Sequence, residues 1–203
     1  MTMAPSQLGV FARTSPDFAT ANAEFHVQPL SLERFGEPLH AFPAITLSVC
    51  NLRPTSCGSI HAESLDERAA PIIRPNYLST EQDIGVAADS IRLARRIAAA
   101  TALARYHPEE IKPGVAFQSN LELAGAASDI GTTIFHPVGT AKMGRDDDPT
   151  AVVDDRLRAR GLEGLRIADA SVMPRIPSGN TNAPTMMIAE KAAAMILADA
   201  AGR

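Results

Sequence analysis

The sequence of 203 residues contains no tryptophan, and aromatic residues make up only 4% of it. Stacking surfaces for bases or sugar rings are therefore scarce. The formal net charge is −4 and no basic patch is evident, so we expect no nucleic-acid partner. The chain also lacks an uninterrupted apolar run of about 18 residues, so we expect no transmembrane helix.

Cysteine is nearly absent as well. The two cysteines, Cys50 and Cys57, are too few for a disulfide framework, and they do not have the C-x-x-C spacing of a metal site. We therefore expect no metal and a reducing compartment. Residues 1–5 carry neither the charged region nor the apolar stretch of a signal peptide, so the predicted location is cytoplasmic.

The sequence also lacks any G-x-G spacing, because no two of its 13 glycines are separated by a single residue. The G-x-G-x-x-G turn that cradles the diphosphate of a dinucleotide is therefore missing. Hydrophobic residues make up 45% of the chain, which is normal for a globular protein.

Short alternating segments dominate the first half and helical periodicity appears later, which predicts strands followed by helices. We expect Thr80 and Asp83 to cap the longest helix. We also expect the strand at 58–64 to pair antiparallel with the one before it. The predicted strands cover residues 7–12, 25–30, 44–49, 58–64, 131–135 and 165–168, and the predicted helices cover 80–106, 120–127 and 182–201.

His136 directly precedes Pro137. A residue before proline is disfavoured in the helical region, so the imidazole should project from an extended segment. Gly139 can then turn the chain at a positive φ. Such a histidine is either a well-aimed acid–base group or a core histidine with satisfied hydrogen bonds.

Asp169 follows the predicted strand at 165–168. At the carboxyl end of a strand it can accept hydrogen bonds from ligand hydroxyls. It can equally cap a turn with its own side chain. The two interpretations stand even.

Asn182 and Pro184 mark the start of the last helix, with Asn182 as the expected N-cap. The free N–H groups of a helix start suit an anion or a polarised carbonyl, although many helix starts are only capped ends. Six apolar residues share one face of this helix: Met186, Ala189, Ala193, Ile196, Leu197 and Ala200.

Three phrases occur in fixed order: FHPVGTAKMG at 135–144, GLRIADASVMP at 164–174 and PSGNTNAPTMMIAEK at 177–191. Together they resemble the carboxyl-terminal part of the glucose-methanol-choline (GMC) family of flavin oxidoreductases. LRPTSCGSI at 52–60 and AAPIIRPNYL at 69–78 add to the resemblance.

The resemblance implies an α+β fold with an antiparallel sheet flanked by helices. Residues 1–141 would form part of the substrate-binding domain. Residues 142–203 would supply the returning carboxyl-terminal strand and helix of the FAD-binding domain.

The resemblance also implies chemistry. Such enzymes oxidise alcohols by removing the hydroxyl proton and passing a hydride to N5 of FAD. By this pattern His136 would be the base or its hydrogen-bonding equivalent, and Asn182 the second active-site group. The residues expected at FAD are Asp169 and Ala170 near the ribityl-diphosphate, and Asn182, Ala183, Pro184 and Thr185 against the isoalloxazine.

The chain departs from the family in two small ways and one large one. Ala141-Lys142 stands where Cys-Arg is frequent, and Arg175 where a smaller residue is usual. The larger departure is the missing G-x-G-x-x-G turn. We therefore expect the carboxyl-terminal portion of an FAD-dependent alcohol oxidase or dehydrogenase, with the amino-terminal FAD-binding part as its missing partner.

Two alternatives remain. One is a truncated, non-catalytic module that binds no flavin by itself. The other is a hydrolase using Ser171 or Ser178 with His136, but it lacks a G-x-S-x-G elbow. If the flavin part is missing, the apolar face of the last helix should be exposed, and the chain should associate.

Overall fold

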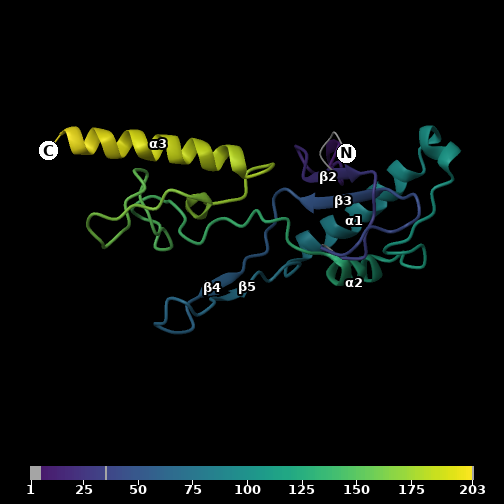
Figure 1. Cartoon of the computed structure of the whole chain (residues 1–203), viewed down its shortest axis with the longest axis horizontal. Coiled ribbons are helices and arrows are strands. Elements are labelled where there is room, and N and C mark those ends of the chain that lie inside the picture. Colours follow the sequence, from purple (N-terminus) through teal and green to yellow (C-terminus); the bar gives the residue numbers. More distant parts are fainter. Residues whose placement is uncertain (1–5, 35, 203) are drawn as a thin grey trace. The chain divides into compact units, whose positions relative to one another are not determined.

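The computed structural model describes residues 6–34 and 36–202, so the expectation about residues 1–5 lies outside it. The chain divides into two compact units (Figure 1). The first comprises Met1–Cys57 and Asn76–Thr132, and the second Gly58–Pro75 and Thr133–Arg203. Within the described parts, no helix is both long and apolar enough to cross a membrane. The division expected at residue 141 refers to the family's domains and stays a prediction.

A three-stranded antiparallel sheet forms the centre of the first unit. Its strands are β1 (Leu8–Ala12), β2 (Ala23–Gln28) and β3 (Thr46–Asn51), in the order β1-β2-β3. The three predicted strands in this region are confirmed. Phe25, in the middle of β2, is fully buried.

Helix α1 (Glu81–Ala98) begins as predicted, because the Thr80 side chain accepts a hydrogen bond from the Asp83 amide. It ends earlier than predicted. Ala100 takes an extended conformation, and a 3-10 helix follows over Thr101–Tyr106. No proline or glycine marks this end in the sequence, so the helical pattern ran past it.

Helix α2 (Asn120–Ile130) is confirmed and runs three residues beyond the predicted end at 127. Ser119 and Glu122 form a capping box at its start. Leu123 packs against Ala88 and Ile91 of α1, which joins the two helices through a small apolar core.

The second unit contains a two-stranded hairpin of β4 (Ser59–His61) and β5 (Ile72–Arg74). The predicted pairing of segment 58–64 with β3 is therefore wrong. Alternation identifies a strand but not its partner. Gly58 permits the tight start of the hairpin, since a Cβ there would lie 2.1 Å from the Arg74 carbonyl oxygen.

Helix α3 (Asn182–Ala201) dominates the rest of the second unit and ends at Gly202 as predicted. Its buried residues Ile188 and Ala192 form an apolar core together with Val153, Leu157, Val172 and Met173. The strands predicted at 131–135 and 165–168 are not formed, and the second segment makes one isolated bridge, between Arg158 and Arg166. The chain is nevertheless α+β with antiparallel sheets and helices, as expected.

Candidate active site

The backbone around His136 turns sharply on both sides. Phe135, directly before it, has φ 64°, and Gly139 has φ 87°, as predicted for the glycine. For phenylalanine the left-handed region costs about 1–2 kcal/mol. Such conformations persist where the surroundings hold them, and they cluster at functional sites.

The segment that follows His136 is fixed to the core of the second unit. The Ala141 amide donates to the Ser171 carbonyl at 3.1 Å, and the Met143 amide donates to the Val172 carbonyl at 2.8 Å. Val138 and Met143 also pack against the apolar core. The histidine therefore rests on a rigid support, although no regular strand carries it.

Both ring nitrogens of the half-buried His136 have partners from the start of α3. Nδ1 lies 2.7 Å from Oγ1 of the buried Thr181, and Nε2 lies 3.0 Å from Nδ2 of Asn180. An amide nitrogen can only donate, so Nε2 accepts and carries no proton. In the neutral ring the proton is then on Nδ1, which donates to the Thr181 hydroxyl.

This arrangement presents a lone pair on Nε2, the atom held by an exposed asparagine. A group that replaces the Asn180 amide at this point would meet a nitrogen ready to accept a proton. Sequence reasoning selected His136 but missed Asn180 and Thr181. Both lie in the PSGNTNAPT phrase, directly before the selected Asn182.

Thr181, and not Asn182, is the N-cap of α3, so the predicted cap is wrong by one residue. The Thr181 hydroxyl bonds His136 and makes no capping bond to the helix. Asn182 becomes the first helical residue, and both it and Ala183 are exposed. The first backbone hydrogen bond of the helix runs from the Thr185 amide to the Thr181 carbonyl at 3.0 Å. The amides before Thr185 therefore have no acceptor within the helix.

The far end of α3 is held by ion pairs. Asp199 accepts a hydrogen bond from Arg156 at 2.6 Å and another from Arg166. These arginines, Arg166 foremost, lower the pKa of Asp199 below its ordinary value. The helix is thus fixed near both ends.

Asp169 caps the 3-10 helix Ala170–Val172, where its carboxylate accepts from the Ser171 amide at 2.8 Å and from the Ser171 hydroxyl. The turn-capping interpretation is therefore confirmed, and the carboxylate is exposed. The roles of Asp169 and Ala170 toward FAD stay predictions.

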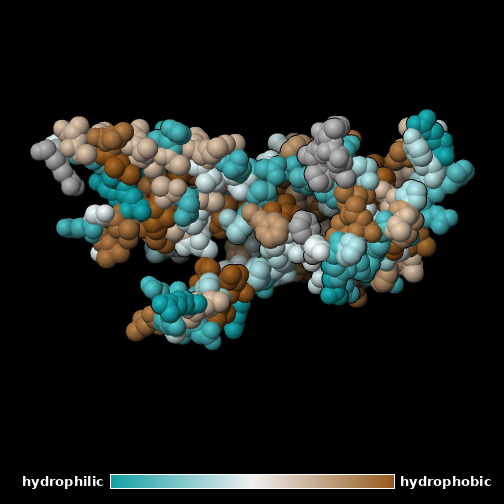
Figure 2. Space-filling view, in the orientation of Figure 1, coloured by the Kyte–Doolittle hydropathy of each residue, from teal (hydrophilic) through white to brown (hydrophobic). Residues whose placement is uncertain are grey.

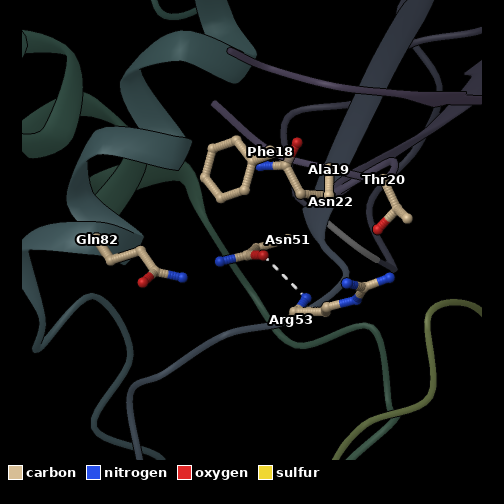
Figure 3. Close-up of a pocket in the computed structure, with 7 residues that line it drawn as sticks. All are labelled: Phe18, Ala19, Thr20, Asn22, Asn51, Arg53 and Gln82. Carbon is tan, nitrogen blue, oxygen red and sulfur yellow. Dashed lines mark hydrogen bonds between the residues drawn. The ribbon is translucent and has the colours of Figure 1, made fainter. Parts of the chain in front are cut away.

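A separate pocket of about 200 Å³ lies in the first unit (Figure 3). The two asparagine amides in its lining are already hydrogen-bonded, since Asn22 bonds Thr14 and Asn51 bonds both Asp83 and the Arg53 amide. None of the predicted site residues lines it. The lining residues are Phe18, Ala19, Thr20, Asn22, Asn51, Arg53 and Gln82.

Comparison with known proteins identifies the family of the chain. The sequence model described as GMC oxidoreductase matches residues 54–189, which contain His136, Asp169 and Asn182. The chain belongs to the GMC oxidoreductase family. The match corresponds to the carboxyl-terminal domain of that family, whose members depend on FAD.

The similar proteins are much longer than this GMC chain. The alcohol dehydrogenase [acceptor] of Pseudomonas putida is 40% identical over 197 residues, covering 97% of the chain and 35% of the relative. Mitochondrial choline dehydrogenase of Mus musculus is 41% identical over 190 residues, covering 94% and 32%. The chain thus spans about a third of the length of the curated relatives it matches.

Solved structures show the same relation. Pyridoxine 4-oxidase from Mesorbium loti matches with TM-score 0.81 and 28% identity, covering 91% of this chain and 36% of that one. A formate oxidase variant from Aspergillus oryzae matches with TM-score 0.80 and 27% identity, covering 89% and 32%. The GMC fold of the carboxyl-terminal part is therefore retained.

Proposed function

We propose that this chain supplies the acid–base histidine of an FAD-dependent oxidoreductase acting on a small-molecule alcohol. The observation that carries the proposal is the pair of contacts that fixes the His136 ring with Nε2 as an acceptor. Membership of the GMC family and the similarity to alcohol and choline dehydrogenases support it.

In the proposed reaction His136 takes the hydroxyl proton of the alcohol at Nε2. The alcohol takes the position of the Asn180 amide at that nitrogen. The Thr181 oxygen accepts from Nδ1 before and after the transfer, so the ring keeps its orientation. Once Nε2 is protonated, the Asn180 side chain can turn its amide oxygen toward it and accept a hydrogen bond.

The chemistry that bound FAD would supply is acceptance of the hydride from the alcohol carbon. The residues present fit its ring end, because the start of α3 offers exposed amides and partial positive charge to an electron-rich ring. In this proposal the residues that would hold the ring are Asn182, Ala183, Pro184 and Thr185. Asn182 would also hydrogen-bond the substrate oxygen, and Asp169 and Ala170 would help to hold the ribityl-diphosphate.

The diphosphate cradle belongs to the proposed partner. No G-x-G spacing occurs in the 203 residues, and the relatives extend over about three times the length matched here. The amino-terminal FAD-binding part of the same enzyme would supply the cradle. The alternative, a module that binds no flavin by itself, is favoured by the same missing spacing.

A chimera tests the proposal. The region of the Pseudomonas putida alcohol dehydrogenase that aligns with this chain is replaced by the chain itself. We expect the product to bind FAD, seen in its visible absorption spectrum, and to reduce an artificial electron acceptor when alcohol is added. His136→Ala should lower the rate by about 10²–10⁴-fold, the usual contribution of a general base, without loss of the flavin spectrum.

His61→Ala is the matched control, because His61 is an exposed histidine on β4 of the same unit. It should leave the rate unchanged. A flavin-loaded chimera whose His136→Ala variant keeps the full rate contradicts the proposed base. The isolated chain, mixed with FAD, separately tests the alternative: a bound-flavin spectrum would exclude the flavin-free module.

A further inference from the structure

One face of the sheet in the first unit brings together three side chains that ligate metals. Glu24 on β2 lies directly opposite Cys50 on β3 in the antiparallel register. His26 lies two residues further along β2, so its side chain is on the same face as Glu24. The group thus offers a carboxylate oxygen, an imidazole nitrogen and a thiol sulfur.

The three ligand atoms are already close enough to share one ion. They all lie within 4.8 Å of one another, and His26 Nε2 is 3.7 Å from Glu24 Oε1. Tetrahedral zinc, with bonds of about 2.0–2.3 Å, separates its ligand atoms by about 3.3–3.6 Å. Small side-chain rotations would close the remaining difference.

Glu24 provides an independent reason to expect a cation here. It is only 5% exposed, and within the described residues no hydrogen bond reaches its carboxylate. The His26 imidazole nitrogen, 3.7 Å from Glu24 Oε1, lies beyond hydrogen-bonding distance. A carboxylate that has lost most of its contact with water is stabilised by a nearby cation, which a metal ion would supply.

We propose that Glu24, His26 and Cys50 bind one Zn²⁺ ion, with a water molecule as the fourth ligand. Mixed sulfur, nitrogen and oxygen ligands suit zinc, and three protein ligands with one open position are a common zinc arrangement. The half-buried His26 leaves room for the water. Local spacing predicted no metal because the third ligand is brought in by strand pairing and not by a short motif.

The test uses the full chain without an affinity tag, first stripped of metal with a chelator. Zn²⁺ is then titrated in competition with a chromophoric chelator, and Co²⁺ is used as a spectroscopic probe. We expect one Zn²⁺ per chain, bound at micromolar or lower free metal. With Co²⁺ we expect the absorption bands of tetrahedral cobalt and a thiolate charge-transfer band.

Variants identify the ligands. Glu24→Gln, His26→Gln and Cys50→Ser should each weaken zinc binding by at least about 100-fold, beyond the range that second-shell changes produce. The matched controls Cys57→Ser and His61→Gln change an exposed cysteine and an exposed histidine elsewhere, and they should bind zinc like the parent chain.

Circular dichroism checks that each variant is folded. If one variant does not fold, the thiolate band in the parent chain and its loss in Cys50→Ser still decide the matter. Binding only at millimolar zinc would overturn the proposal. So would zinc binding by Cys50→Ser as tight as in the parent chain, or cobalt bands that depend on Cys57.

Discussion

At the residue scale, the notable feature of the site is that one histidine is held from both ring nitrogens. The buried Thr181 hydroxyl lies 2.7 Å from Nδ1 of His136, and the Asn180 amide lies 3.0 Å from Nε2. The first contact orients the ring, and the second can exchange for a substrate. The division of roles follows from burial, because Thr181 is 6% exposed whereas Asn180 is on the surface.

Replacing Thr181 with valine should weaken the preference of the neutral His136 ring for the tautomer protonated at Nδ1. The parent chain should show His136 protonated at Nδ1, whereas Thr181→Val removes the acceptor and about 1 kcal/mol of preference, which is about a five-fold change in the tautomer ratio. Long-range ¹⁵N–¹H spectra of the imidazole rings measure this in the chain itself. Thr181→Ser keeps the hydroxyl and should resemble the parent, and a parent spectrum with the proton on Nε2 would refute the assignment.

The sequence allowed some of this site to be predicted. The turn around His136 and Gly139 was predicted from the backbone preferences of proline and glycine, and the resemblance to the GMC family selected the His136 imidazole as the base. The contact between His136 and Thr181 joins residues 45 positions apart, and nothing local encodes it. Asn182 was predicted as the N-cap because asparagine favours that position. In the structure Thr181 is the N-cap, and the helix begins at Asn182, one residue earlier than predicted. The Thr181 hydroxyl bonds His136 instead of capping the helix.

At the element scale, Asp83 joins α1 to the loop after β3. Its buried carboxylate accepts from the Ser56 amide at 2.8 Å, the Thr55 amide at 3.0 Å and the Asn51 side chain at 3.0 Å. Burial by itself would raise the pKa of Asp83. The hydrogen bonds from Ser56 and Thr55 outweigh it, so the pKa lies below its ordinary value.

Asp83→Asn should therefore destabilise the chain and reduce its sensitivity to acid. A carboxyl with a lowered folded pKa stabilises the fold above its unfolded pKa of about 4, and the contribution is lost as pH falls through the folded value. We expect the free energy of unfolding of the parent chain to decrease as the pH is lowered below about 4. The variant should lose about 2–3 kcal/mol at pH 7 and fall less steeply with acid.

Urea unfolding followed by circular dichroism at several pH values measures both effects. Asp89→Asn is the control on the same helix, since Asp89 is partly exposed and pairs with Arg92 at 3.0 Å. Its cost should stay below about 1 kcal/mol. Equal losses in the two variants would show that the buried network around Asp83 adds nothing.

Helices and strands were predictable where the residues that stabilise them are close together in the sequence. The Thr80 cap of α1 is local and was predicted, and the Ser119 capping box of α2, which was not predicted, is equally local. Strands at 131–135 and 165–168 were predicted from composition, yet a strand exists only with a partner. Within the described residues, segment 165–168 finds only a single bridge, between Arg158 and Arg166.

At the scale of the whole molecule, α3 is apolar on the side that faces solvent. The residues that pack inward lie on one line, with Ile188 and Ala192 buried. Met186, Ile196 and Leu197 are 56%, 46% and 70% exposed, on the face that sequence periodicity grouped together. Figure 2 shows this apolar surface along α3. The expected exposure of that face is thus seen, and in the proposed enzyme the FAD-binding part covers it.

Without that partner the chain should self-associate through α3, because contiguous exposed apolar surface favours burial. We expect light scattering coupled to size-exclusion chromatography to give a mass above 21.5 kDa that rises with concentration. Leu197→Glu places a charge on the apolar face and should shift the chain toward the monomer. Leu162→Glu adds the same charge at an exposed leucine outside α3 and should not. A parent chain that stays monomeric at high concentration would contradict the prediction and show that the exposed face of α3 is tolerated in water.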